Sequence, residues 1–164
     1  MKSTLITLSF FCTFATAQDC YRSMVQSPTP FMGNNGEIAK LTDGSIWEIQ
    51  YEYEYMYEYY PSVIACPSRG VLVVKDKKLT ARLISGGPGA TKTNVIESYI
   101  ESSFSGLNMG NIYRLSNGQI WEQTEAWIWY WSWSRPKVML YTDGGITKMK
   151  VENIDHAVSV RRLK

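Results

Sequence analysis

Residues 36–48 read Gly36-Glu37-Ile38-Ala39-Lys40-Leu41-Thr42-Asp43-Gly44-Ser45-Ile46-Trp47-Glu48, and residues 110–122 read Gly110-Asn111-Ile112-Tyr113-Arg114-Leu115-Ser116-Asn117-Gly118-Gln119-Ile120-Trp121-Glu122. The second stretch repeats the first at a constant offset of 74 positions, with the glycines, isoleucines, leucine, tryptophan and final glutamate identical in place. Similarity at a fixed offset indicates a repeated structural unit. We therefore interpret the chain as two copies of one small domain.

The repeat continues into an aromatic segment downstream of each quoted stretch. At the same offset, the first copy has Tyr53, Tyr55, Tyr57 and Tyr59 where the second has Trp127, Trp129, Trp131 and Trp133. One position later in register, Pro61-Ser62-Val63 corresponds to Pro136-Lys137-Val138. Alternation of this kind is typical of a β-strand, so we expect one long aromatic strand in each copy.

The turns and the apolar pattern inside each copy favour an all-β fold. Asp43-Gly44 and Asn117-Gly118 stand between alternating segments and predict tight hairpin turns in which the glycine has a positive φ. Four or five short strands in about seventy residues predict a small curled barrel of the SH3-like or OB-like class. The equivalent Trp47 and Trp121 are expected in the cores. The predicted fold class is all-β, with two tandem small curled barrels joined by a short linker or helix.

The expected domain organisation has four parts. Residues 1–17 form a signal peptide, residues 18–85 the first β domain, residues 86–103 a linker with a short helix, and residues 104–164 the second β domain. The composition of Ser85-Gly86-Gly87-Pro88-Gly89-Ala90 indicates the linker. The helix is predicted from a cap at Thr93 or Asn94 and from the spacing of Val95, Ile96, Tyr99 and Ile100.

The second copy also resembles a known family. It contains Phe104-x-Gly106, then Leu115-Ser116-Asn117-Gly118-Gln119-Ile120-Trp121-Glu122-Gln123, the aromatic segment, and Pro136-x-Val138. This pattern resembles a small β module scattered through bacterial proteins, many of them secreted. The first copy departs from it, with Asp43, Ser45 and Ile49 where the second has Asn, Gln and Gln. The resemblance carries over no catalytic residues.

The first residues are typical of an export signal. Lys2 gives a basic start, and residues 5–14 form an apolar run too short to span a bilayer as a stable helix. Ala15-Thr16-Ala17 then matches a small-x-small cleavage site. We expect cleavage after Ala17 and a secreted or periplasmic product without stable membrane insertion.

Cleavage at this point would remove Cys12 and leave Cys20 and Cys66 in the exported chain. An even number of cysteines in an oxidising compartment favours a disulfide between them. A free buried thiol at either position is the alternative.

Composition excludes some classes of protein. The chain has 164 residues, of which 45% are hydrophobic and 13% aromatic, with 6 Trp and 11 Tyr, and its net charge is only +2. So many aromatic residues exclude a disordered chain. So small a net charge gives no support to a nucleic-acid partner bound through bulk positive charge.

The residues offer no catalytic or metal-binding group. His156 is the only histidine, and a catalytic base also needs a positioned partner. No cluster of Cys and His has the spacing of metal ligands, so we expect neither a metal nor a cofactor. Glu52, Glu54 and Glu58 are interpreted as a solvated strand face, because the second copy lacks them. The chain is therefore not expected to be an enzyme.

The aromatic segments are the candidate site. A strand over residues 51–59 would be about 26 Å long, more than a small domain can cover, so some rings should lie outside the barrel. Exposed aromatic patches usually have a partner. The predicted binding residues are Trp127, Trp129, Tyr130, Trp131 and Trp133 of the second copy, which is expected to be the stronger site, and Tyr51, Tyr53, Tyr55, Tyr57 and Tyr59 of the first. Packing of these rings in the barrel core is the alternative.

Three functions remain. The first is a secreted or periplasmic non-catalytic module that binds a glycan, a peptide or a protein through its aromatic strands. The second is a structural, self-associating envelope protein, in which the aromatic rings build a homo-oligomer. The third is an inhibitor of an extracytoplasmic enzyme.

Overall fold

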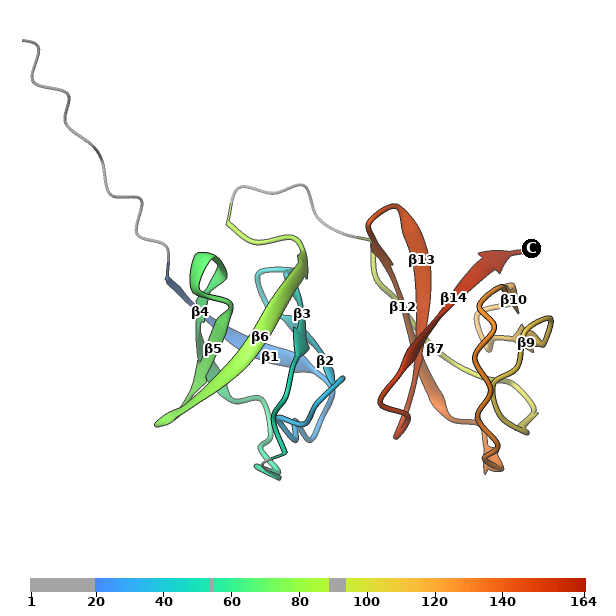
Figure 1. Ribbon diagram of the computed structural model, residues 1–164, viewed down its shortest axis with the longest axis horizontal. Coiled ribbons are helices and arrows are strands. Elements are labelled where there is room, and N and C mark those ends of the chain that lie inside the picture. Colours follow the sequence, from blue (N-terminus) through green and yellow to red (C-terminus); the bar gives the residue numbers. More distant parts are fainter. Residues whose placement is uncertain (1–19, 54, 89–93) are drawn as a thin grey trace, which may run out of the picture.

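The computed structural model describes residues 20–53, 55–88 and 94–164, and within them the protein is built from β-strands (Figure 1). These residues contain no α-helix, only a 3₁₀ turn at Pro67–Arg69. The predicted all-β class is confirmed. The predicted signal peptide and its cleavage site lie outside the described residues. No helix in the described part of the chain is long and apolar enough to cross a bilayer.

Six strands of the first half close into a barrel. They are β1 (Tyr21–Ser27), β2 (Ile38–Leu41), β3 (Ile46–Ile49), β4 (Ser62–Cys66), β5 (Val71–Val74) and β6 (Lys77–Ser85). All neighbours are antiparallel, in the order β1-β2-β3-β6-β5-β4, and β4 returns to β1. Closure leaves this barrel without an unpaired strand edge among the described strands.

The second half forms a curled six-stranded sheet and a small two-stranded sheet. The strands are β7 (Ile96–Tyr99), β8 (Ser103–Phe104), β9 (Ile112–Arg114), β10 (Ile120–Gln123), β11 (Trp133–Ser134), β12 (Lys137–Asp143), β13 (Ile146–Val151) and β14 (Ala157–Arg162). The large sheet has the order β7-β12-β13-β14-β10-β9, and β11 pairs with β8. Its two edge strands approach each other through the bridge between Ile100 and Leu115. The cyclic strand order therefore matches that of the first barrel.

Equivalent hydrogen bonds recur in the two halves at the 74-residue offset. Gly44 N donates to Leu41 O, and Gly118 N donates to Leu115 O, each at 2.9 Å. Both turn glycines have the predicted positive φ, 87° at Gly44 and 82° at Gly118. Because neither position has another atom close to its missing Cβ, backbone conformation alone accounts for these two glycines.

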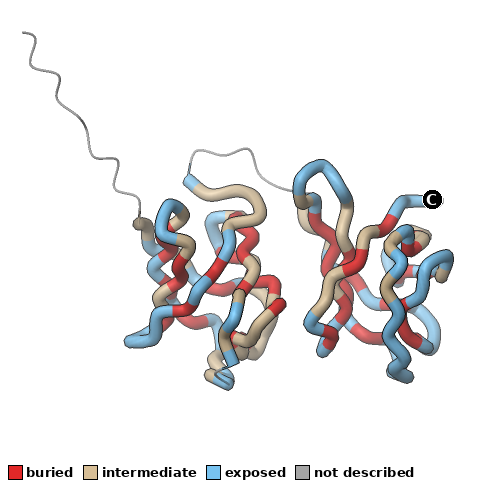
Figure 2. The backbone as a smooth tube through the Cα atoms, in the orientation of Figure 1, coloured by how far each residue is buried: buried red, intermediate tan, exposed pale blue. Residues whose placement is uncertain are grey.

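Each half has its own apolar core, with Trp47 in the first and Trp121 in the second (Figure 2). Both tryptophans are buried as predicted, with 0% and 5% of their surface exposed. The indole Nε1 of Trp47 donates to Ser45 Oγ at 3.0 Å, and that of Trp121 donates to Gln119 Oε1 at 3.1 Å. Different side chains thus satisfy the same buried donor at equivalent positions.

The predicted linker helix is wrong. Residues 96–99 form β7, which pairs with β12 and belongs to the second sheet. Ser98 and Ile100 are buried whereas Glu97 and Tyr99 are exposed. This alternation has the period of two that is typical of a strand, and the apolar positions that predict a helix fit the strand equally well. The second unit therefore begins before residue 104, the start that the sequence predicts. The remainder of the predicted linker, at residues 89–93, lies outside the described residues.

Cys20 and Cys66 form the predicted disulfide, with their Cα atoms 4.2 Å apart. The bond attaches the start of β1 to the end of β4. Disulfides of this kind are typical of proteins in oxidising compartments.

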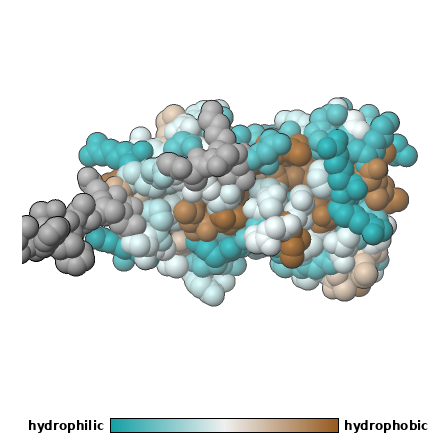
Figure 3. All heavy atoms as spheres, turned by 90° about the horizontal axis from the view of Figure 1, so that it is seen from above, coloured by the Kyte–Doolittle hydropathy of each residue, from teal (hydrophilic) through white to brown (hydrophobic). Residues whose placement is uncertain are grey.

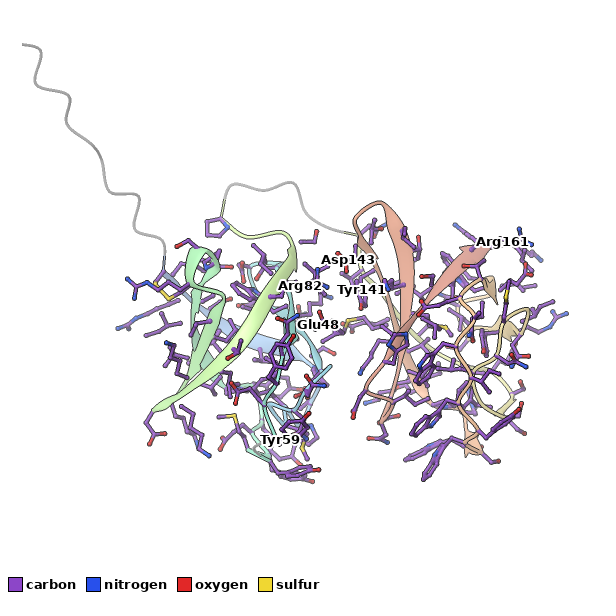
Figure 4. All side chains as sticks on the ribbon, viewed as in Figure 1. Glu48, Tyr59, Arg82, Tyr141, Asp143 and Arg161 are labelled. Atoms are coloured by element: carbon purple, nitrogen blue, oxygen red, sulfur yellow. A yellow bond between two sulfur atoms is a disulfide. The ribbon has the colours of Figure 1, made fainter. Side chains whose placement is uncertain are left out.

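The two units contact each other through a third apolar cluster and a set of ion pairs. Ile38 and Ile46 of the first unit pack with Met139 and Tyr141 of the second. Arg82 lies between the units, where its Nη2 is 2.8 Å from Glu48 Oε2 and 2.8 Å from Asp143 Oδ2 (Figure 4). The pair with Asp143 joins the two units, whereas Glu48 belongs to the same unit as Arg82 and orients its guanidinium.

A glycine also marks the contact between the units. Gly36 has a φ of 75°, and a Cβ built on it would overlap the backbone carbonyl of Asp155 in the second unit. The equivalent Gly110 has a φ of 84° and no atom near its Cβ position. The close approach of the two units at this point therefore requires a residue without a side chain.

Candidate binding surface

The first aromatic segment is an irregular loop, which corrects the predicted long strand. We call residues 51–60 the Tyr loop. Among its described residues, 51–53 and 55–60, strand pairing is limited to isolated bridges that join Phe31 to Glu58 and Asn34 to Tyr53. The backbone has a positive φ at Tyr51, Tyr57 and Tyr60, and a left-handed residue breaks the alternation of a strand.

The tyrosine rings of this loop face solvent, whereas two of its glutamates do not. The sequence predicts a solvated face for Glu52 and Glu58, but both side chains contact residues of the barrel instead. Glu52 Oε1 accepts a hydrogen bond from Thr80 N at 2.8 Å, and Glu58 Oε1 lies 2.6 Å from Lys75 Nζ. Glu54 lies outside the described residues. The exposed side chains are Tyr51, Tyr53, Tyr55, Tyr57, Tyr59 and Tyr60, at 56% to 79% of their surface.

The second aromatic segment, residues 126–134, is called the Trp loop. It is also irregular before β11, so the predicted strand is wrong here too. Trp129 and Leu107 exchange two backbone hydrogen bonds, of 2.8 and 2.9 Å. Trp127 is partly buried against the second core, and its neighbours point outward. The exposed fractions are 43% for Trp129, 81% for Tyr130, 50% for Trp131 and 37% for Trp133.

Ring contacts order the Trp loop. The rings of Trp127 and Trp129 stack with an interplanar angle of 4° and centroids 5.7 Å apart. The ring of His156 also contacts Trp127, with a centroid distance of 4.5 Å. Trp131 and Trp133 form a second pair at 6.4 Å. The Trp loop therefore presents aromatic surface whose geometry is set before any ligand arrives.

Glu125 anchors the base of the Trp loop. Its Oε1 lies 2.7 Å from His156 Nε2, and its Oε2 accepts hydrogen bonds from both N and Oγ of Ser159 at 2.9 Å. Partial burial raises the pKa of the Glu125 carboxyl, but the hydrogen bonds from His156 and Ser159 outweigh burial, and the pKa lies below its ordinary value. The serine hydroxyl contacts the carboxylate and not the imidazole, so the trio lacks the arrangement that activates a nucleophile.

This lowered pKa predicts how acid affects stability. A carboxyl whose pKa is lower in the folded protein stabilises the fold above its ordinary pKa, and that contribution is lost as the pH falls toward the folded value. Between about pH 5 and pH 3, we expect the unfolding free energy of the Glu125→Gln variant to fall less steeply than that of the native protein. Urea unfolding across this range measures the effect. The exposed Glu101→Gln is the control, and an equally flattened curve for it would contradict the assignment.

A cleft of about 660 Å³ lies between the two units. Tyr57 and Tyr60 of the Tyr loop line one side, and Tyr99 and Lys137 line the other. Sequence patterns gave no signal for this cleft, because its residues come from segments far apart in the chain.

Burial shifts the pKa of two ionisable groups of the cleft. Burial raises the pKa of Glu37 even though its carboxylate accepts hydrogen bonds from Met32 N, Gly33 N and Asn34 N. Burial lowers the pKa of Lys150 to about 8. Within the described residues, no group of three or more His, Cys, Asp and Glu side chains is placed to hold a metal ion.

The structure thus leaves the predicted site residues in two loops, one on each unit, with most of the rings exposed and Trp127 packed against the second core. It adds Glu125 and His156 at the base of the Trp loop and the cleft between the units. Comparison of the chain with family models, with curated proteins and with solved structures finds no match.

Proposed function

We propose that the protein is an exported, non-catalytic binding module whose Tyr loop and Trp loop contact the ligand. The supporting observation is exposed aromatic surface on a constrained backbone. Of the six non-glycine residues with positive φ in the described chain, Tyr51, Tyr57 and Tyr60 lie in the Tyr loop, and Arg135 directly follows the Trp loop. Such conformations are unfavourable and concentrate at functional sites. Exposed aromatic side chains that gain nothing from core burial are retained where a partner covers them.

Two further features belong to the same proposal. The shared strand order and the matched hydrogen bonds at the 74-residue offset support a tandem repeat of the bacterial β module that the second copy resembles. The apolar run and small-x-small site before Gln18, together with the Cys20–Cys66 disulfide, support export to the periplasm or the exterior.

The test replaces the most exposed part of the Trp loop. Tyr130→Ser combined with Trp131→Ser is expected to abolish retention of the purified protein on bacterial cell-envelope material in a pelleting assay. Because these two rings are 81% and 50% exposed, the free energy of unfolding should fall by only about 1–2 kcal/mol. Trp129 is left in place because it stacks on Trp127.

Ile146→Ser is the control, since Ile146 is a large apolar residue, 54% exposed, outside both loops. It should bind as the native protein does. Retention of the double variant at the native level would refute the proposal. A native dimer that dissociates in the double variant, seen by sedimentation velocity, would instead support the self-associating envelope protein.

A further inference from the structure

The two aromatic loops reach the same level at one end of the molecule. In Figure 1 the Tyr loop is the lowest part of the first unit, and the Trp loop is the lowest part of the second. In Figure 4 the side chains near Tyr59 extend as far down as those at the bottom of the second unit. Figure 2 shows that exposed residues dominate both lower ends. A flat partner at this end can therefore contact both loops at once.

The cleft between the units does not connect the loops. Tyr57 and Tyr60 of the Tyr loop line it, but none of its lining residues belongs to the Trp loop. A ligand held in the cleft would therefore leave the exposed rings of Trp129, Tyr130 and Trp131 uncovered. A partner that covers both loops has to approach from the end of the molecule on which they lie.

The exposed apolar side chains of the two loops are of one kind. Apart from Ile128, every large apolar side chain that the described parts of the loops expose is Tyr or Trp. Elsewhere in the described chain, the exposed large apolar residues are mostly aliphatic: Met24, Ile64, Met109, Ile112, Ile146 and Leu163, with Tyr99 as the aromatic exception. Tyr and Trp are enriched where a bilayer meets water, because each joins an apolar ring to a polar group.

The indole N–H groups of the Trp loop are available to a partner. In the two cores, the indole N–H groups of Trp47 and Trp121 each donate a hydrogen bond to a neighbouring side chain. Those of Trp129, Trp131 and Trp133 have no acceptor among the described residues. The phosphate and ester oxygens of phospholipids are acceptors, so they would pair with these donors while the rings contact the acyl chains.

The charges beside the loops favour an anionic partner. The Trp loop contains neither Asp nor Glu, and Arg135 and Lys137 follow it. Both are exposed and form no ion pair with the described residues, because Glu152 bonds to the backbone N–H of Lys137 and not to its ammonium group. In the Tyr loop, the carboxylates of Glu52 and Glu58 are already engaged by the barrel. Exposed basic side chains are attracted to anionic headgroups.

A phospholipid bilayer fits these features together. It is flat on the scale of the protein, its interface is the region that Tyr and Trp prefer, and its phosphates supply hydrogen-bond acceptors and negative charge. We infer that both loops bind the surface of a bilayer that contains anionic phospholipid, with their rings at the level of the headgroups and both barrels in water. This inference rests on the proposed function and names its partner.

The opposite end of the molecule provides matched controls. Figure 3 views that end, where hydrophilic residues spread over both units and apolar residues form separate areas. The turn between β12 and β13, which Ile146 follows, lies there in Figure 1, as does the turn between β4 and β5, which contains Arg69. Ile146 is therefore the control for an exposed apolar residue, and Arg69 is the control for an exposed charge.

The first experiment measures binding to vesicles by co-sedimentation. The vesicles contain phosphatidylcholine and phosphatidylglycerol in equal parts. Tyr53→Ser with Tyr55→Ser removes two rings of the Tyr loop that are 76% and 78% exposed, and the Trp-loop variant is again Tyr130→Ser with Trp131→Ser. Each should bind about tenfold more weakly than the native protein, because it keeps only one of two linked contacts. Ile146→Ser should bind as the native protein does.

The second experiment tests charge, with vesicles of phosphatidylcholine alone for comparison. The native protein should prefer the mixed vesicles by about tenfold. Arg135→Asn with Lys137→Gln should remove this preference, and asparagine suits the left-handed backbone at position 135, where φ is 52°. Arg22→Gln with Arg69→Gln removes the same charge away from the loops and should keep the preference. Loss of the preference in this control would overturn the assignment of charge to the loops.

The third experiment separates insertion of the rings from adsorption by charge. The mixed vesicles are prepared with phosphatidylcholine brominated on its acyl chains near the headgroup, which quenches tryptophan fluorescence on contact. Trp47 and Trp121 are buried, so quenching in the native protein would come from the Trp loop. We expect quenching of the native protein and little in the Trp-loop variant. Binding of the native protein without quenching would overturn the placement of the rings in the bilayer interface.

The outcomes separate this inference from the proposed function. If the native protein does not bind the vesicles, or if neither loop variant binds more weakly, the lipid partner is wrong. If only one loop variant loses binding, contact through both loops is wrong. In either case the proposed function is decided independently by retention on envelope material and its loss in the Trp-loop variant. Such retention without vesicle binding would leave a binding module whose partner is a protein or a glycan.

Discussion

Replacing Trp47 by alanine is expected to lower the free energy of unfolding of the first unit by about 3–5 kcal/mol. Trp47 is the largest of the fully buried side chains in the described structure. Its removal leaves a cavity within a closed barrel that cannot collapse easily. It also removes the donor to Ser45 Oγ, a hydroxyl that itself contacts Asp43 Oδ1 at 3.1 Å. Urea unfolding followed by circular dichroism measures the change.

The matched variant is Trp121→Ala in the second unit. Since Trp121 holds the equivalent place at 5% exposure, its loss should be of similar size and confined to the second unit. Amide hydrogen exchange resolved by residue shows which strands lose protection in each variant. A loss below about 1 kcal/mol for Trp47→Ala would mean that the ring does not fill the barrel as described.

Removing the disulfide should have an effect of comparable size. The bond between Cys20 and Cys66 closes a separation of 46 residues, and loss of such a closure lowers stability by about 4 kcal/mol when chain entropy dominates. The variant is Cys20→Ala with Cys66→Ala, which introduces neither a charge nor a large side chain. Thermal unfolding should show an earlier transition for the first unit.

The second unit provides an internal control for that experiment. It has Tyr141 at the position of Cys66 and contains no cysteine. Its strands β12, β13 and β14 should keep their hydrogen-exchange protection in the double variant. An unchanged first transition would contradict a stabilising role for the bond, and equal losses in both units would show that the units unfold together.

The fold was largely predictable because its decisive features are local. A glycine after Asp43 or Asn117 needs only its own backbone preference to form a hairpin turn, and alternation over four residues identifies the flanking strands. Residues 96–100 were harder, because the same apolar positions match a helix and a strand. Pairing with β12, which is not visible in the local sequence, decides in favour of the strand.

The sequence predicted which aromatic residues are exposed at the candidate site, but not the backbone conformation that carries them. Excess aromatic length indicated that the rings lie outside the core, and the exposed tyrosines agree. The alternation nevertheless predicted strands where loops occur. Left-handed backbone at Tyr51, Tyr57 and Tyr60 interrupts the strand, and the described part of the loop keeps isolated bridges such as the one between Phe31 and Glu58. The cleft and the Glu125–His156 pair also depend on residues far apart in the chain, so no local pattern could indicate them.

The contact at Gly36 makes the two halves unequal in the substitutions they can accept. Position 110 needs only a left-handed backbone, which asparagine and aspartate also adopt, so these residues are compatible with it. Position 36 adds a neighbouring carbonyl that leaves no room for any Cβ, so only glycine is compatible there. Two positions that began with the same requirement therefore face different mutational constraints. The first half, which carries Gly36, is therefore less free than the second half to change its sequence at this turn.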